Sequence, residues 1–220
     1  MSGCVVSVNV ARPDQVLTGP WTGSKQRTGI GKLPVDGPVQ TGHNQLAGDS
    51  ICDLANHGGP DQAVYAYSRE DARWWADELG RELPPGMFGE NLSTEGMDLS
   101  QAVIGELWSV GSAVLEVSCP RIPCRVFAGF WDVPDLIKRF TVEGRPGAYL
   151  RIHQAGALQA GDEVRIEHRP EHGVTIRETF RALTGDRSLA HRLLEAPELP
   201  AQAHQRARVW LAGSPATSTG

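Results

Sequence analysis

The stretch Val117–Cys124 (VSCPRIPC) gathers the residue types best suited to chemistry, with two cysteines, two prolines and an arginine. Proline fixes the backbone φ angle and lacks an N–H donor, so Pro120 and Pro123 should end the preceding strand and stiffen the loop. Arg121 and Cys124 would then share that loop, where a neighbouring cation favours the thiolate. A thiolate is both a nucleophile and a metal ligand. We therefore expect the chemistry here, although a buried cysteine beside a structural ion pair is the plain alternative.

Three further places in the chain could bind a ligand. In His57-Gly58-Gly59 the glycines would let backbone N–H groups approach an anion, whereas the alternative is a tight turn. Lys32 lies among glycines and prolines and could reach a phosphate, although a solvated surface lysine is the commoner case. Asn91 offers a donor and an acceptor, but it could instead hold a loop pinned by its apolar neighbours.

The elements that would position these residues are mainly short strands separated by Gly- and Pro-rich turns. The expected strands are 5–10, 31–39, 63–67, 103–110, 113–118, 149–153 and 163–167. Ser68 is a good helix cap and predicts a helix to about residue 79, and a second helix is expected from Asp132 to Gly144. Three short helical patterns follow at 176–183, 188–196 and 200–211.

This pattern predicts a mainly β fold, a barrel or curled sheet, followed by a small helical unit. We place the barrel at residues 1–169, a three-helix C-terminal extension at residues 170–213, and a disordered tail at residues 214–220.

Composition restricts the classes of partner. The formal net charge of −5 gives no overall basic footprint for nucleic acid. No window is apolar enough for a membrane span, and the N-terminus lacks the pattern of a signal peptide, so we expect a cytoplasmic protein. The four cysteines form no CxxC pair, and neither cysteines nor histidines have the spacing of a structural zinc site.

Taken in order, the motifs resemble one known family. The series is Lys32-x-Pro34-Val35, Gly48-Asp49, His57-Gly58-Gly59-Pro60-Asp61, Phe88-Gly89-Glu90-Asn91-Leu92, Ile104-Gly105-Glu106, Pro120-Arg121-x-Pro123-Cys124 and Gly161-Asp162. This set resembles the MOSC domain, named for the C-terminal domain of molybdenum cofactor sulfurases. Within that family it is similar to the stand-alone YiiM-type bacterial proteins, which also carry a three-helix extension. The expected fold is therefore a β-barrel-like MOSC domain.

The resemblance implies binding of the molybdenum cofactor (molybdopterin), with Cys124 as the protein ligand of molybdenum and the catalytic residue. It also implies cofactor-binding roles for a further group of residues, namely Arg27, Lys32, His57, Gly58, Gly59, Asn91 and Arg121. Of these, Arg27 and Lys32 would supply positive charge for the cofactor phosphate. The implied activity is the reduction of N-hydroxylated compounds, with Glu90 as a candidate acid and electrons from a separate redox protein. The oligomeric state is left open.

Two alternatives for the same site remain: a sulfur carrier using a Cys124 persulfide, and a non-catalytic carrier of the cofactor. The sequence also departs from the family pattern at two positions. Cys52 lies in Ser50-Ile51-Cys52-Asp53, where Gln-Ala-Asp is common, and Cys119 precedes Pro120, where glutamine is frequent. A second thiol near Cys124 suggests a regulatory disulfide or a sulfur relay.

Overall fold

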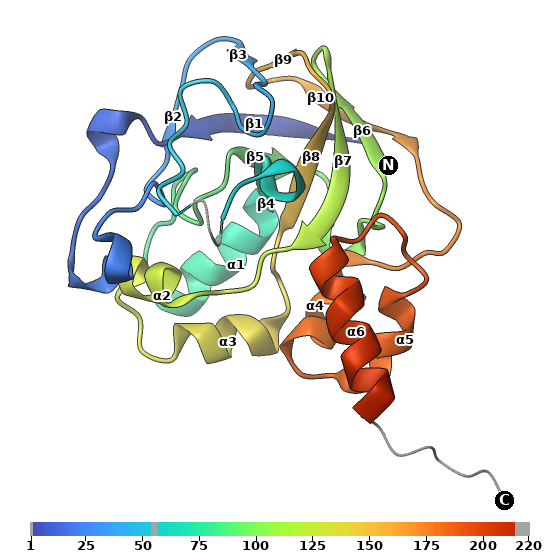
Figure 1. Cartoon of the computed structure of the whole chain (residues 1–220). Coiled ribbons are helices and arrows are strands. Elements are labelled where there is room, and N and C mark those ends of the chain that lie inside the picture. Colours follow the sequence, from blue (N-terminus) through green and yellow to red (C-terminus); the bar gives the residue numbers. More distant parts are fainter. Residues whose placement is uncertain (1, 54–56, 214–220) are drawn as a thin grey trace, which may run out of the picture.

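The computed structural model describes residues 2–53 and 57–213. In this part of the chain, seven strands close into a mixed β-barrel (Figure 1). They are β1 (Ser2–Val10), β4 (Val64–Ser68), β5 (Leu92–Glu95), β6 (Leu107–Val110), β7 (Ala113–Pro120), β8 (Ala148–Gln154) and β10 (Glu163–His168). Their order around the barrel is β10-β6-β7-β8-β4-β5-β1, and pairing of β1 with β10 closes it. The predicted barrel is confirmed.

Most neighbouring strands are antiparallel, and the pair β4–β5 is parallel. The parallel pair is joined by helix α1 (Arg69–Leu79), because parallel strands need a crossover connection. Ser68 caps this helix by accepting a hydrogen bond from the Asp71 N–H, and Gly80 ends it with a left-handed φ of 61°. Both ends agree with the prediction from sequence.

Shorter strands lie outside the closed barrel, and two of them form a separate two-stranded sheet. The strand β2 (Leu33–Pro34) pairs with the end of β1, and β3 (Val39–Gln40) pairs with β9 (Ala157–Leu158). The prolines of the 31–39 segment explain why it contributes only these short edge pieces. The predicted strand at 103–110 is also shorter than expected, since β6 begins at Leu107.

Two helices follow Cys124, where the sequence predicted one. The helix α2 (Arg125–Trp131) begins directly after Cys124 and ends at Asp132, which has a left-handed φ of 49°. The expected helix from Asp132 appears as α3 (Leu136–Glu143), which ends at Gly144 as predicted. Helix α2 was missed, and it places Cys124 at the start of a helix rather than inside a loop.

The C-terminal helices are α4 (Ile176–Thr184), α5 (Ala190–Leu193) and α6 (Ala201–Gly213). Figure 1 shows them grouped beside the end of strand β7. Their buried residues, among them Ile176 and Leu193, belong to the same hydrophobic cluster as the barrel residues Val117 and Leu150. The helices therefore share a core with the barrel. The predicted boundary at residue 169 remains a prediction, and the predicted tail lies outside the described residues.

Short 3₁₀ helices connect several of these elements: η1 (Pro13–Gln15), η2 (Pro20–Lys25), η3 (Pro60–Gln62), η4 (Leu99–Gln101) and η5 (Arg187–Leu189). A second hydrophobic cluster lies where α1, α2 and α3 meet, and it is dominated by aromatic rings such as Trp75, Phe88 and Trp131. Edge-on pairs such as Trp75–Trp131 and the stacked pair Trp75–Phe140 fix the orientation of the helices that contribute them.

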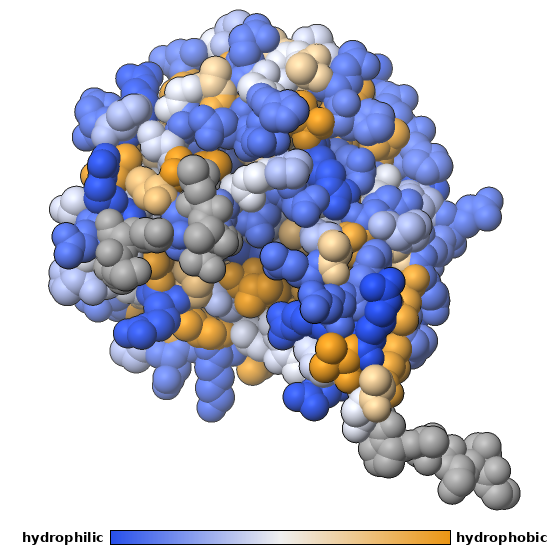
Figure 2. All heavy atoms as spheres, in the orientation of Figure 1, coloured by the Kyte–Doolittle hydropathy of each residue, from blue (hydrophilic) through white to orange (hydrophobic). Residues whose placement is uncertain are grey.

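The molecular surface in Figure 2 is mainly hydrophilic, with a hydrophobic group over the C-terminal helices. Exposed large hydrophobic side chains there include Leu194, Val209 and Leu211. Within residues 2–53 and 57–213, none of the helices has the length and apolar character needed to cross a membrane.

Candidate functional site

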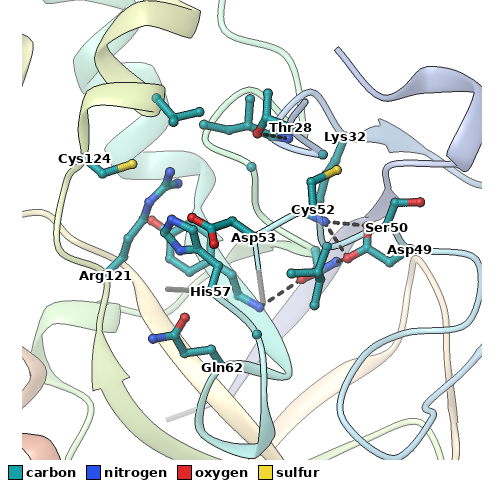
Figure 3. Close-up of a pocket in the computed structure, with 18 of the residues that line it drawn as sticks. Thr28, Lys32, Asp49, Ser50, Cys52, Asp53, His57, Gln62, Arg121 and Cys124 are labelled. Carbon is teal, nitrogen blue, oxygen red and sulfur yellow. Dashed lines mark hydrogen bonds and ion pairs between the residues drawn. The ribbon is translucent and has the colours of Figure 1, made fainter. Parts of the chain in front are cut away.

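A pocket beside the barrel gathers most of the predicted site residues. Its lining residues are Thr22, Tyr65, Tyr149 and some of the residues of the segments 27–32, 49–53, 57–63, 89–91 and 121–126. Figure 3 shows Cys124 and Arg121 on one side of this pocket and Cys52, Ser50 and Asp49 on the other. Seven of the eight predicted residues line it, namely Arg27, Lys32, His57, Gly58, Asn91, Arg121 and Cys124. Gly59 is not among the lining residues.

Cys124 lies at the junction between the 121–124 loop and helix α2, and its side chain is partly exposed to the pocket. Burial alone would raise the pKa of its thiol. A hydrogen bond with His57, the positive charge of Arg121 and the backbone N–H of Phe127 outweigh burial and lower this pKa to about 7. Near neutral pH a large fraction of Cys124 is therefore thiolate, the form that binds metals and attacks electrophiles.

Arg121 is buried, and its guanidinium is held mainly by aromatic rings. Its central carbon lies 4.5 Å from the Phe127 ring centre and 5.1 Å from the Tyr65 ring centre. One Nη donates to the backbone carbonyl of Phe88, while Nε has no hydrogen-bond partner among the described residues. A buried guanidinium with a free donor beside a thiolate makes this side of the pocket suitable for an anionic or acceptor group.

Lys32 points to Asp49 rather than to open pocket space. Its Nζ lies 2.5 Å from both carboxylate oxygens of Asp49, and both side chains are buried. Burial lowers the pKa of Lys32, and the Asp49 carboxylate opposes that effect. Because Asp49 neutralises the ammonium charge, Lys32 offers less to a phosphate than its sequence context suggests. The exposed Arg27 keeps its charge available at the pocket wall.

The side-chain amide of Asn91 forms hydrogen bonds within the protein through both its nitrogen and its oxygen. Its Nδ2 donates to the Asn9 carbonyl at 3.2 Å and to the Asp49 carboxylate at 2.8 Å. Its Oδ1 accepts from the backbone N–H of Tyr65 at 3.1 Å. The alternative of a structural asparagine therefore describes its contacts better than a free pterin-binding amide does, although Asn91 still lines the pocket.

The His57-Gly58-Gly59 turn enters the short helix η3. Gly58 and Gly59 have φ values of 82° and 78°, a region that favours glycine. This conformation directs the chain so that His57 reaches Cys124 while η3 brings Gln62 into the pocket wall. The two glycines thus serve the turn geometry, and Gly58 also lines the pocket.

Two residues that the sequence suggested for chemistry lie away from the pocket wall. Glu90 is fully buried, where it accepts hydrogen bonds from the N–H groups of Gly86 and Phe88 and from Ser93 Oγ. It closes the 86–90 loop instead of facing a substrate. Cys119 is buried in β7, and burial raises its pKa to about 11, so it stays a neutral thiol at physiological pH.

The structure adds pocket residues that sequence reasoning did not select: Asp49, Cys52, Gln62, Tyr65 and Tyr149. Burial raises the pKa of Tyr149 to about 12, despite the nearby Arg121. The sequence carried a signal for two of these residues, because Asp49 belonged to the ordered motifs and Cys52 to a departure from them. The others read as ordinary strand or turn residues.

A family model for the MOSC domain matches residues 53–165, just over half of the chain. The protein YflK of Bacillus subtilis is 34% identical over 172 residues, which cover 78% of this chain and 76% of YflK. A protein named "Reductase" from Gibberella moniliformis is 30% identical over 81% of this chain, but the match spans only 32% of that longer protein.

Among solved structures, YiiM from Geobacillus stearothermophilus superposes with a TM-score of 0.79 and 26% identity. The match covers 95% of this chain and 99% of that one, so the C-terminal helices are included as well as the barrel. The family takes its name from molybdenum cofactor sulfurase, which suggests an association with that cofactor. On its sequence match, its relatives and its fold, the chain belongs to the MOSC domain family.

Proposed function

We propose that this pocket binds the molybdenum cofactor, with Cys124 as the protein ligand of molybdenum. The observation that carries the proposal is the Cys124 thiol, whose pKa of about 7 makes it a soft anionic donor inside a pocket. Thiolates are preferred by soft metal centres. Family membership supports the same assignment.

The residues of the pocket fit such a group in two ways. Among the described residues, no three or more His, Cys, Asp or Glu side chains are arranged to hold a metal ion. A metal at Cys124 would therefore take its remaining ligands from outside the protein, as a pterin dithiolene provides. In addition, the unpartnered Nε of Arg121 and the exposed Arg27 offer positive charge to an anionic cofactor.

The proposed reaction is the reduction of N-hydroxylated compounds. Cleavage of R–NH–OH consumes two electrons and two protons and gives R–NH₂ and water. When bound, the cofactor would supply the two-electron redox chemistry, and a separate redox protein would replace those electrons. The contribution of this chain is to hold the thiolate of Cys124 through His57 and Arg121 and to shape the pocket with Tyr65 and Tyr149. The relative named "Reductase" supports this class of chemistry.

Turnover of a model substrate tests the reaction. The protein purified from a cofactor-producing host is given benzamidoxime and a chemical reductant, and benzamidine is measured by chromatography. We expect wild-type turnover, and a loss of more than about 100-fold in Cys124→Ser because the metal ligand is removed. Cys52→Ser is the matched control, since Cys52 lines the same pocket, and it should stay within a few-fold of wild type. Equal activity of wild type and Cys124→Ser would contradict the proposal.

The same thiol also suits the sulfur-carrier alternative, because a pKa of about 7 makes Cys124 a nucleophile at neutral pH. Mass spectrometry separates the two functions. A Cys124 persulfide in protein without molybdenum would favour the carrier, whereas cofactor-loaded protein that turns over benzamidoxime favours the reductase. Cofactor without turnover would favour a non-catalytic carrier.

A further inference from the structure

Arg151 of strand β8 connects three separate parts of the molecule through one guanidinium. Its Nε donates to Asp61 Oδ1 at 2.7 Å, and its Nη1 donates to Glu116 Oε1 at 2.5 Å. Its Nη2 donates to the backbone carbonyl of Glu198 at 2.7 Å. The three acceptors belong to η3, to β7 and to the connection between α5 and α6. A planar guanidinium suits this task because its donors diverge in fixed directions.

The first acceptor belongs to the segment that carries His57. Asp61 lies in η3, four residues after His57 and next to the pocket residue Gln62. The backbone carbonyl of Asp61 also accepts from Ser118 Oγ of β7. Between His57 and Asp61 the chain passes through two glycines with positive φ, which restrict the backbone little. The position of this segment therefore depends on what holds Asp61.

The third acceptor is itself held firmly. The Glu198 side chain lies 3.2 Å from Nε2 of His172, and it packs on Gly105, where an added Cβ would lie 2.7 Å from Glu198 Cγ. Figure 1 shows β8 behind β7, with the C-terminal helices beside the end of β7. The C-terminal helices do not line the pocket, yet Arg151 gives them a direct polar link to the segment that does.

We propose that Arg151 is a positioning residue, which fixes the 57–62 segment against Cys124 by tying it to β7 and to the C-terminal helices. The Arg151 side chain is 20% exposed and that of Glu116 is 17% exposed, so this ion pair is less screened by solvent than an ordinary surface pair. The Asp61 side chain is 40% exposed, so its link to Arg151 depends more on the direct 2.7 Å hydrogen bond. The inference rests on the proposed role of the Cys124 site. The placement of the segment is nevertheless measurable in protein that carries no cofactor.

Hydrogen–deuterium exchange of the full chain tests this role. The amides of His57 and Gln62 donate to the carbonyls of Asp53 and Gly59, so their exchange reports the order of the segment. In Arg151→Met we expect these amides to exchange about tenfold faster while β1 amides keep wild-type protection. Asp61→Asn weakens the same link from the other side and should give the same local change. If Arg151→Met does not fold, Asp61→Asn alone provides the test.

Three controls separate positioning from a general loss of stability. Arg165→Met removes an exposed arginine ion pair on β10 and should leave the segment unchanged. Glu116→Gln removes the charge of the β7 anchor but keeps an oxygen that can accept from Arg151, so it should accelerate exchange in the segment less than Arg151→Met does. Arg151→Lys keeps the charge but cannot reach three acceptors at once, so it should not restore protection. Wild-type exchange in Arg151→Met and Asp61→Asn, equal acceleration across the whole chain, or full rescue by lysine would overturn the proposal.

Discussion

The Cys124 side chain has surroundings that favour its ionised form, and the residues responsible come from distant parts of the chain. Arg121 is close in sequence and follows directly from the PRIPC motif. His57 is 67 positions earlier and reaches the thiol only because η3 and β4 bring its loop back to the barrel mouth. The chemistry of this one residue therefore depends on a local motif and on a long-range contact.

The lowered pKa of Cys124 has a direct consequence for its reactivity. The thiolate form dominates above the pKa. The rate at which iodoacetamide alkylates Cys124 should therefore rise with pH, with a midpoint near 7, and level off at higher pH. In His57→Gln the midpoint should move up toward the ordinary value of 9. Cys119, with a pKa raised to about 11, should stay unmodified across this range. Peptide mapping by mass spectrometry follows both sites, and an unchanged midpoint in His57→Gln would contradict the account.

Gln62 is a pocket residue that the sequence did not single out. Its side-chain carbonyl oxygen is buried in the pocket wall and has no hydrogen-bond partner among the described residues. An unsatisfied acceptor costs about 1–3 kcal/mol. Gln62→Met should therefore leave the melting temperature unchanged or raise it by about 2–4 °C, while the protein retains less cofactor.

The matched comparison for Gln62 is Asn91, whose amide is fully bonded. Asn91→Leu should lower the melting temperature, because it leaves the buried Tyr65 N–H without an acceptor and removes a hydrogen-bond donor from Asp49. Differential scanning calorimetry measures both variants. A fall for Gln62→Met as large as that for Asn91→Leu would show that Gln62 serves the fold instead of the ligand.

The sequence predicted the pocket residues that lie in local motifs, such as Cys124, Arg121 and Gly58. It could not show that Lys32 is neutralised by Asp49, since these residues are 17 positions apart and meet only when the barrel closes. Tyr149 and Gln62 gave no signal, because a strand tyrosine and a turn glutamine are common in any barrel. Long-range pairing is the part of the site that spacing does not encode.

At the level of elements, helix α2 decides how Cys124 is presented. Sequence reasoning missed it because Gly129 interrupts an aromatic-rich segment and glycine is a poor helix former. The structure gives the reason for the glycine: an added Cβ at Gly129 would lie 2.4 Å from the Cβ of Trp21 in η2. The glycine allows η2 to pack closely on α2 beside the pocket.

Gly129→Ala should separate η2 from α2, because a Cβ contact of that length forces one element to move. Overpacking of this kind typically costs about 1–3 kcal/mol, which urea denaturation would detect. Gly213→Ala in α6 is the control, since nothing lies within 4 Å of its Cβ position. Wild-type stability of Gly129→Ala would contradict the close packing of η2 on α2.

For the whole molecule, buried residues of the closed barrel and of the C-terminal helices belong to one hydrophobic cluster, and the sequence pattern predicted these helices only as a small unit after the barrel. The barrel could be predicted at the level of fold class, from the short strands and frequent turns in the sequence. The shared core could not, because the apolar faces of α4 to α6 do not specify which surface they cover.

Phe180 of α4 tests whether the C-terminal helices unfold together with the rest of the molecule, because it packs into the aromatic cluster of α1, α2 and α3. It is fully buried, and its ring centre lies 6.5 Å from that of Phe140 in α3. Phe180→Ala should lower the stability of the whole protein by about 3–5 kcal/mol and keep a single unfolding transition. Circular dichroism and tryptophan fluorescence should then give the same midpoint. Separate transitions for the helices and the barrel would instead support two independent units.

Metal content shows whether Cys124 holds the molybdenum of a bound cofactor. Protein purified from a cofactor-producing host is analysed for molybdenum and for released pterin, each relative to folded protein. We expect both molybdenum and pterin in wild type and in Cys52→Ser, and a loss of molybdenum in Cys124→Ser with the fold retained. Folded wild-type protein that contains neither molybdenum nor pterin would contradict this proposal.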